Sequence, residues 1–203
     1  MIKDDADNIA SAKRDWAKTW RESKAAARHA IVADNDDKTA KAIWDYALLL
    51  SSERCVQEVL PLLEAAKPTA FWKAFYECWN IFDDTWQFMP RLLRALRRNA
   101  TQAPPYTQMP RVSAKIFDTL PDDVQVFRGC SRERVAGLSW SLSRDVATQF
   151  AHGHRGLVVP HPVIAEATIS KRAIFALMTS RAERELVLEP DKLTHIQVIG
   201  FEQ

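Results

Sequence analysis

The hydrophobic period of this chain changes near its middle, and that change limits the folds open to it. Over about the first hundred residues, apolar side chains recur at helical spacing. Ile9, Trp16, Trp20, Ala27 and Ile31 follow one another in alternating steps of seven and four. From about residue 120, short segments alternate apolar and polar residues, as half-buried strands do. The sequence therefore predicts an α+β protein in which helices precede an antiparallel sheet.

A proline-rich stretch separates the two halves. Roughly residues 99–110 contain three prolines and no apolar period, which is typical of a linker. We expect a helical region over 1–105 and a sheet domain over 106–203. With 203 residues, 47% of them apolar, the chain is long enough to bury a proper core.

The helical half carries one broad aromatic face. Asp36 or Asp37 is expected to cap the second helix, and Pro61 to kink or divide the third. The aromatic residues that follow at helical spacing are Phe71, Trp72, Phe75, Trp79, Phe82 and Trp86. Helical periodicity mainly reports burial, so this face is interpreted as core and not as a binding surface.

The second half predicts a short helix and then strands. Val112, Ile116 and Phe117 are expected to face inward on the helix. One later helix, RDVATQFA, is expected after a Ser143 cap. The expected strands are VQVFRG, LSWSLS, GLVV, VIAEATI, AIFALM, ELVLEP and HIQVIGF.

Charge and cysteine content exclude several classes. A net charge of +2 gives no global attraction to nucleic acid or membrane, and three widely spaced cysteines indicate reduced thiols. The start MIKDDADNIA lacks a signal-peptide core, so we expect a cytoplasmic protein without a membrane segment.

One basic helix carries Arg91, Arg94 and Arg98. A solvated face is the favoured reading, and a phosphate contact or an acidic partner is the alternative.

Three short motifs in the second half carry candidate chemistry. Arg128 ends a strand and precedes Gly129, which suits a bidentate phosphate contact with close backbone approach. Ser139 and Ser141 share one face of the next strand and can line a polar site. Glu183 and Glu185 precede an apolar run. If the chain is already extended at 183, the two acids share a face and repel one another, which packing alone does not explain.

This order of arginine, Ser-x-Ser and Glu-x-Glu resembles the R-S-E class of ADP-ribosyltransferases, over roughly residues 124–203. The middle motif departs from the family's usual Ser-Thr-Ser, because it reads Ser-Trp-Ser. The resemblance implies an ADP-ribosyltransferase-like sheet core with one intervening helix. It also implies NAD as co-substrate and no metal.

The resemblance also assigns roles. Arg128 would bind the NAD pyrophosphate, with the Gly129 backbone near the nicotinamide amide. Ser139 would hold the nicotinamide ribose and orient Glu185, and Ser141 would line the same site. Phe150 would lie against the nicotinamide ring, with core packing as the alternative. Glu185 would stabilise the cation that forms as the glycosidic bond breaks, and Glu183 would take a proton from the acceptor.

The function implied is mono-ADP-ribosyl transfer to a macromolecular acceptor. Protein arginine is favoured by the Glu-x-Glu motif, and nucleic acid is the second acceptor class. Such enzymes act as toxins, phage-encoded host modifiers or antiphage effectors, and an inhibitory antitoxin or another protein is an expected partner. The alternatives are an NAD glycohydrolase and a non-catalytic module whose helices bind a partner beside a degenerate sheet.

Overall fold

The computed structural model describes residues 2–33, 35–83, 85–153, 158–179 and 184–200, with backbone alone for residues 2–10. Its contacts divide the chain into two compact units, Met1–Asp84 and Thr85–Gln203. This division precedes the boundary expected at residue 105. Helix α5 (Met89–Gln102) belongs to the second unit, where Arg97 donates hydrogen bonds to Glu189 at 2.8 Å and to Asp191 at 2.6 Å.

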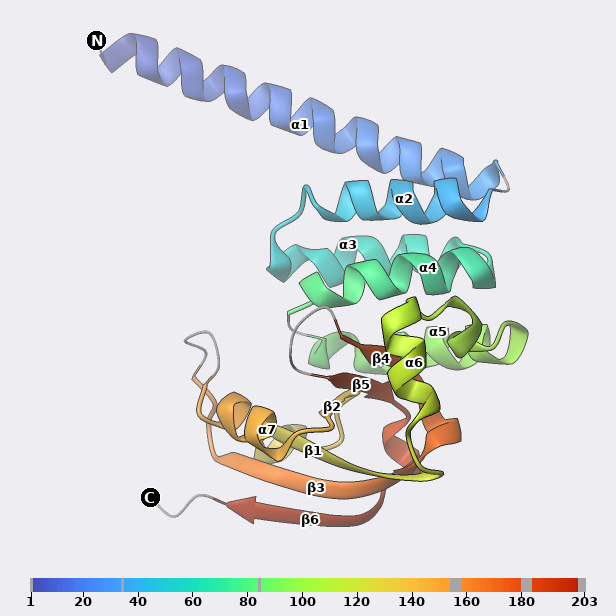
Figure 1. Cartoon of the computed structure of the whole chain (residues 1–203). Helices are drawn as coiled ribbons and strands as arrows, with labels where there is room; N and C mark the ends of the chain where they lie inside the picture. The colour runs from blue at the N-terminus through green and yellow to red at the C-terminus, as the bar shows by residue number, and fades with distance from the viewer. Residues whose placement is uncertain (1, 34, 84, 154–157, 180–183, 201–203) are drawn as a thin grey trace. The chain divides into compact units, whose positions relative to one another are not determined.

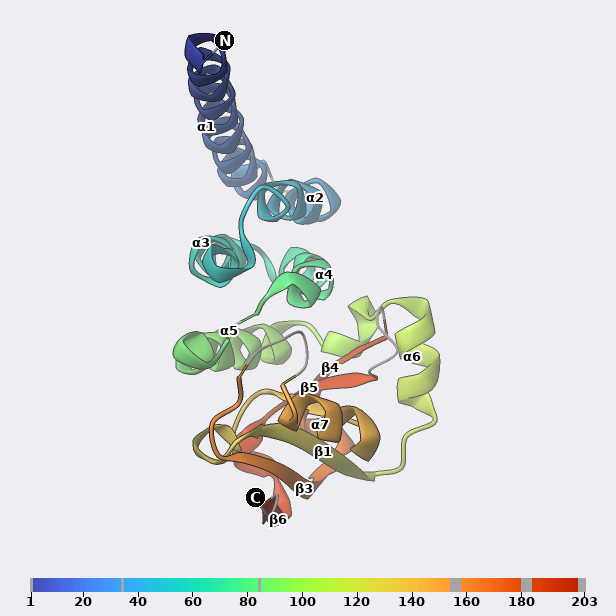
Figure 2. The same ribbon diagram turned by 90° about the vertical axis from the view of Figure 1, so that its left-hand side faces the viewer.

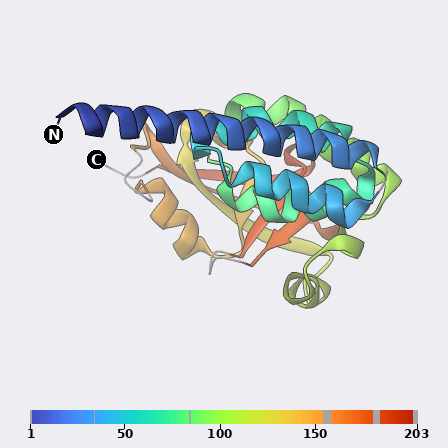
Figure 3. The same cartoon turned by 90° about the horizontal axis from the view of Figure 1, so that it is seen from above.

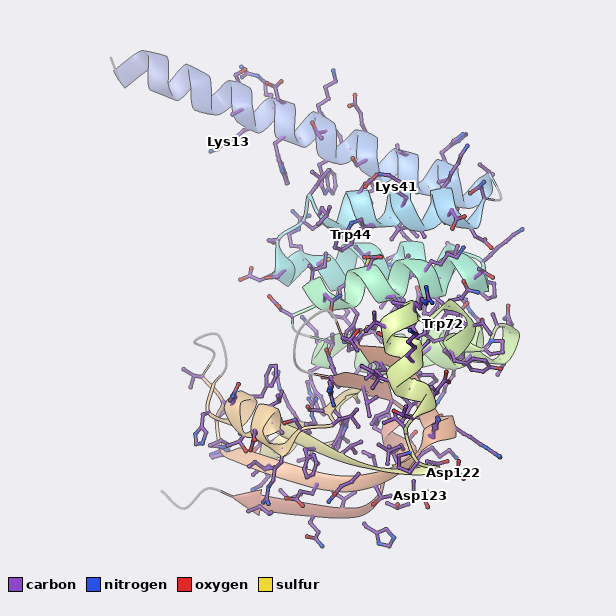
Figure 4. All side chains as sticks on the ribbon, viewed as in Figure 1. Lys13, Lys41, Trp44, Trp72, Asp122 and Asp123 are labelled. Carbon is purple, nitrogen blue, oxygen red and sulfur yellow. The ribbon has the colours of Figure 1, made fainter. Side chains whose placement is uncertain are left out.

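The first unit is helical. It comprises α1 (Ile2–Val32), α2 (Asp36–Ala47), α3 (Ser52–Ala65), α4 (Pro68–Cys78) and the 3-10 turn η1 (Trp79–Ile81). α1 packs against α2 and α3, and its N-terminal part runs past the end of α2 (Figure 3). Lys13 stands on that extension (Figure 4), where Trp16 is 49% exposed. Within the described ranges, no helix is both long and apolar enough to cross a membrane.

The aromatic face of this unit is core, as the sequence predicts. Phe71, Trp72, Phe75, Trp79 and Phe82 are all buried, and their rings contact one another edge-on or tilted, with Phe71 and Phe75 stacked. The heptad spacing does not continue to residue 86, because α4 ends at Cys78.

One expectation for the first unit is wrong, and a second is wrong in part. Asn35, not Asp36 or Asp37, caps α2, since its side-chain oxygen accepts a hydrogen bond from the Lys38 amide at 2.9 Å. Pro61 does not divide α3, which runs unbroken from Ser52 to Ala65.

The second unit contains one sheet, together with helices and 3-10 turns. Its helices are α5, α6 (Arg111–Asp118) and α7 (Arg144–Ala151), and its 3-10 turns are η2 (Trp86–Phe88), η3 (Pro105–Gln108), η4 (Arg132–Arg134), η6 (Lys171–Ala173) and η7 (Pro190–Lys192). Its strands are β1 (Asp123–Ser131), β2 (Ser139–Ser141), β3 (Pro162–Ser170), β4 (Ile174–Met178), β5 (Glu185–Leu188) and β6 (Thr194–Gly200).

The strands form one antiparallel sheet in the order β4-β5-β2-β1-β3-β6 (Figure 1). β1 begins at Asp123, labelled in Figure 4 beside Asp122, and pairs along its whole length with β3. Its pairing with β2 is confined to Phe127 opposite Ser141. β6 is an edge strand, and all seven of its residues are exposed.

Helix α7 covers β1 and part of β3 (Figures 1 and 2). It spans the residues predicted, and Ser143 caps it by accepting a hydrogen bond from the Val146 amide at 3.4 Å. Its buried Ala147 and Ala151 face Gly129 of β1. A Cβ at Gly129 would lie 1.7 Å from the Ala147 carbonyl oxygen, so only glycine admits this approach of helix backbone to strand.

Several local expectations for the second unit fail. Residues 158 and 159 of the predicted GLVV strand are not in a strand, and the other two residues lie outside the described ranges. On α6, Val112 is 64% exposed, and Ser113 is buried instead, bonded to Thr179 at 2.9 Å. The predicted linker begins within α5, because that helix continues to Gln102.

Candidate functional site

Cross-strand pairing places four residues, three of them with polar side chains, in one row across the sheet. Glu185 on β5 lies opposite Ser141 on β2, Ser141 lies opposite Phe127 on β1, and Phe127 lies opposite Glu166 on β3. Directly opposed residues project from the same face of a sheet, with Cβ atoms about 5 Å apart. Gly129 also belongs to this face, so the row lies on the side of the sheet that α7 packs against.

The two serines of β2 occupy different positions relative to Glu185. Ser141, not Ser139, is the directly opposed residue, and Ser139 lies opposite Val187, diagonal to Glu185. Ser141 is buried, and its Oγ accepts a hydrogen bond from the Ser143 amide at 3.0 Å. Both serine side chains therefore lie on the same face of the sheet as Glu185, as the alternation predicts.

The tryptophan between these serines has a packing role. Trp140 is buried on the opposite face of β2, and its Nε1 donates to the Gly137 carbonyl at 2.9 Å. The unusual Ser-Trp-Ser motif thus leaves the serine face unchanged and anchors the segment that precedes β2.

Arg128 crosses from β1 to the segment leading into β2. Its Nε donates to the Arg134 carbonyl at 3.1 Å, and its Nη1 donates to the Ser139 carbonyl. A Cβ at Gly137 would lie 2.4 Å from Nη2, so the guanidinium packs directly on that glycine. Arg128 therefore joins β1 to the connection before β2, whatever else it binds.

Arg128 is half-buried in the second unit. Burial lowers the pKa of its guanidinium, and the neighbouring Cys130 and Glu185 oppose that effect. Arginine nevertheless stays protonated in proteins. Burial likewise raises the pKa of the Cys130 thiol, against the lowering effect of Arg128, so the thiol is not an activated nucleophile.

The Glu-x-Glu pair is described only in part. Glu183 lies outside the described residues. Arg184 has φ 42°, in the left-handed region, and β5 begins at Glu185. The extended alternation used to predict a shared face therefore stops at Glu185.

Gly129 of β1 contacts helix α7, and Phe150 belongs to that helix. The close contact with the α7 backbone supplies a packing reason for Gly129, which the motif assigned to ligand approach. Phe150 is 36% exposed, so its ring is not fully buried in the core. Its role beside a nicotinamide ring stays a prediction.

Two further pairs in the second unit were not predicted from the sequence. Glu166 lies 2.9 Å from the Arg144 guanidinium as an ion pair, although its buried Oε1 lacks hydrogen-bond geometry. The Arg134 guanidinium lies 5.9 Å from the centroid of the Trp86 ring. Glu166 is a single acidic residue within the apolar run of β3, and this pattern could have pointed to it. The contact between Arg134 and Trp86 joins separate segments and cannot be predicted from a local pattern.

The described residues contain no group of three His, Cys, Asp or Glu side chains placed to hold a metal ion. The chain matches no family model, no curated protein and no solved structure. The arrangement offers a carboxylate at the start of β5, a hydroxyl opposite it on β2, and a half-buried guanidinium that donates to the backbone of β2.

Proposed function

We propose that this protein transfers ADP-ribose from NAD to a macromolecular acceptor. One observation supports the proposal: strand β2 carries a contact to each of the other two motifs. The Arg128 guanidinium donates to the Ser139 carbonyl, and Ser141 lies opposite Glu185.

In the proposed reaction, the bond between C1′ of the ribose and the nicotinamide nitrogen breaks, and nicotinamide leaves with the electron pair. The acceptor forms a new bond to C1′ and loses a proton. Glu185 stabilises the positive charge that develops on the ribose, as carboxylates do in glycoside hydrolysis. Arg128 offsets the charge of the pyrophosphate.

The testing change is Glu185→Gln. The amide keeps the size of the side chain but removes the charge that faces the developing cation. We expect nicotinamide release from NAD to fall on the order of a hundred- to a thousandfold, while the dissociation constant for NAD stays within a few-fold. Chromatography of released nicotinamide and calorimetric titration with NAD measure the two quantities.

Glu189→Gln is the matched control. Glu189 follows the other end of β5 and contacts Arg97, so its loss should leave nicotinamide release near that of the parent. If Glu185→Gln kept activity within a few-fold of the parent, Glu185 would be structural. If the parent consumed no NAD with protein and nucleic-acid acceptors supplied, the binding-module alternative would replace the proposal.

A further inference from the structure

Arg184, the residue before Glu185, has an unusual backbone and a fixed place. Its φ of 42° lies in a region that costs a non-glycine residue of this kind some strain. Its carbonyl accepts a hydrogen bond from the Leu142 amide at 3.2 Å, and β5 starts at the next residue. The start of β5 and the end of β2 therefore hold this exposed residue beside Glu185.

The Arg184 guanidinium has no carboxylate partner among the residues that the structure describes. Other arginines of the same unit do: Arg97 contacts Glu189 and Asp191, and Arg144 contacts Glu166. An exposed arginine without an ion pair is common by itself. Its position, strained and adjacent to the proposed catalytic carboxylate, makes its charge relevant to whatever approaches that carboxylate.

Arg134 is a second exposed cation of the same unit. Its guanidinium lies near the Trp86 ring, and its carbonyl accepts the hydrogen bond from Arg128 Nε. Arginine next to an aromatic ring is the combination that proteins use to bind single-stranded nucleic acid, by phosphate contact and base stacking.

We propose that Arg184 selects the acceptor by binding a phosphate of single-stranded nucleic acid. This inference rests on the proposed function. A cation beside Glu185 repels an arginine guanidinium and attracts a phosphate, so it favours nucleic acid over the protein arginine that the Glu-x-Glu motif favours. A ring or exocyclic nitrogen of a base then bonds to C1′, nicotinamide leaves with the electron pair, and the nitrogen loses its proton to water.

The test compares Arg184→Gln, Arg184→Lys and the parent, with labelled NAD and single-stranded RNA, single-stranded DNA or a protein extract. We expect the parent to label nucleic acid. Arg184→Gln should reduce that labelling about tenfold and flatten the plot of log rate against log salt concentration by about 0.7, the value for one phosphate contact. Arg184→Lys should restore most of both.

Two further measurements show whether the Arg184 substitution affects transfer to the acceptor or the cleavage of NAD. Nicotinamide release without acceptor should stay within about twofold of the parent in Arg184→Gln, because water needs no phosphate contact. Arg172 is another exposed arginine of the second unit, and Arg172→Gln should behave like the parent in every assay.

Each adverse outcome has its own meaning. Labelled protein without labelled nucleic acid overturns the inference and leaves the proposed function intact. Equal loss of transfer and of nicotinamide release in Arg184→Gln also overturns it, because the residue would then bind NAD or support the fold. No nicotinamide release by the parent with any acceptor overturns the proposed function and the inference together.

Discussion

Gly129 lies where α7 comes closest to β1, and a methyl group there has no space. In Gly129→Ala the new Cβ would meet the Ala147 carbonyl oxygen at 1.7 Å and the Ala151 amide nitrogen at 2.6 Å, both backbone atoms. We expect the second unit to lose about 1–3 kcal/mol or more of unfolding free energy, as overpacked cores do. Chemical denaturation measures the change.

Gly200→Ala is the control for that substitution. A Cβ at Gly200 would come within 3.3 Å of a single atom, the end of the flexible Arg132 side chain. Its effect should stay within about 0.5 kcal/mol, as for most surface substitutions. A Gly129→Ala variant as stable as Gly200→Ala would show that α7 does not hold its place against β1.

Some residues of the candidate site can be proposed from short sequence motifs, and others only from the folded structure. Arg128, Ser139, Ser141 and Glu185 stay candidates from motifs of two or three residues, and alternation along a strand predicts only that Ser139 and Ser141 share a face. The Gly137 contact with Arg128 and the Glu166 position in the row depend on pairing between distant segments. A local sequence pattern cannot predict pairing between segments that are far apart in the chain.

At the scale of elements, one carboxylate connects the first three helices. Glu58 on α3 accepts hydrogen bonds from Lys24 of α1 at 2.6 Å, from Tyr46 of α2 at 3.0 Å and from Arg54 of its own helix at 3.1 Å. The Trp20 ring lies beside the Lys24 ammonium and the Tyr46 ring. α1 is thus fixed to its neighbours by a partly buried polar network as well as by apolar packing.

This network predicts a pH-dependent stability. The hydrogen bond from Lys24 lowers the pKa of Glu58, so its stabilisation is present above the unfolded-state pKa of about 4.3 and is lost as the pH falls through the folded-state pKa. Glu58→Gln should cost about 1–3 kcal/mol at pH 7, and the cost should become smaller as the pH is lowered towards 3. Denaturation of both proteins at the two pH values measures this. A constant difference would mean that the Glu58 charge contributes nothing.

Elements were predicted better than their ends. Strands β1, β3, β4, β5 and β6 and helices α6 and α7 lie close to the segments that the apolar spacing predicts, although β6 is exposed and α6 does not bury Val112. The errors concern caps and breaks. Asn35 competes with two aspartates for one cap, and the α3 backbone accommodates Pro61 without a break, which depends on packing that local sequence does not report.

At the scale of the whole molecule, the division at Asp84 predicts two separable unfolding events. Hydrogen exchange of the full chain, followed by mass spectrometry over a urea series, should show residues 11–83 and 85–200 losing protection at different urea concentrations. Glu58→Gln should move only the first event, since its contacts all lie in the first unit. A single shared event, moved as a whole by the substitution, would contradict this.

The exposed edge strand β6 affects how the protein must be handled. Its seven residues, THIQVIG, include no Lys, Arg, Asp, Glu or Pro, the residues with which natural sheets block unwanted pairing. Ile196, Val198 and Ile199 are each 40–49% exposed on it. Open backbone groups on such a strand can recruit strands from other molecules. Concentrated samples will therefore tend to precipitate through this edge, and its tendency to aggregate is a property of the folded state.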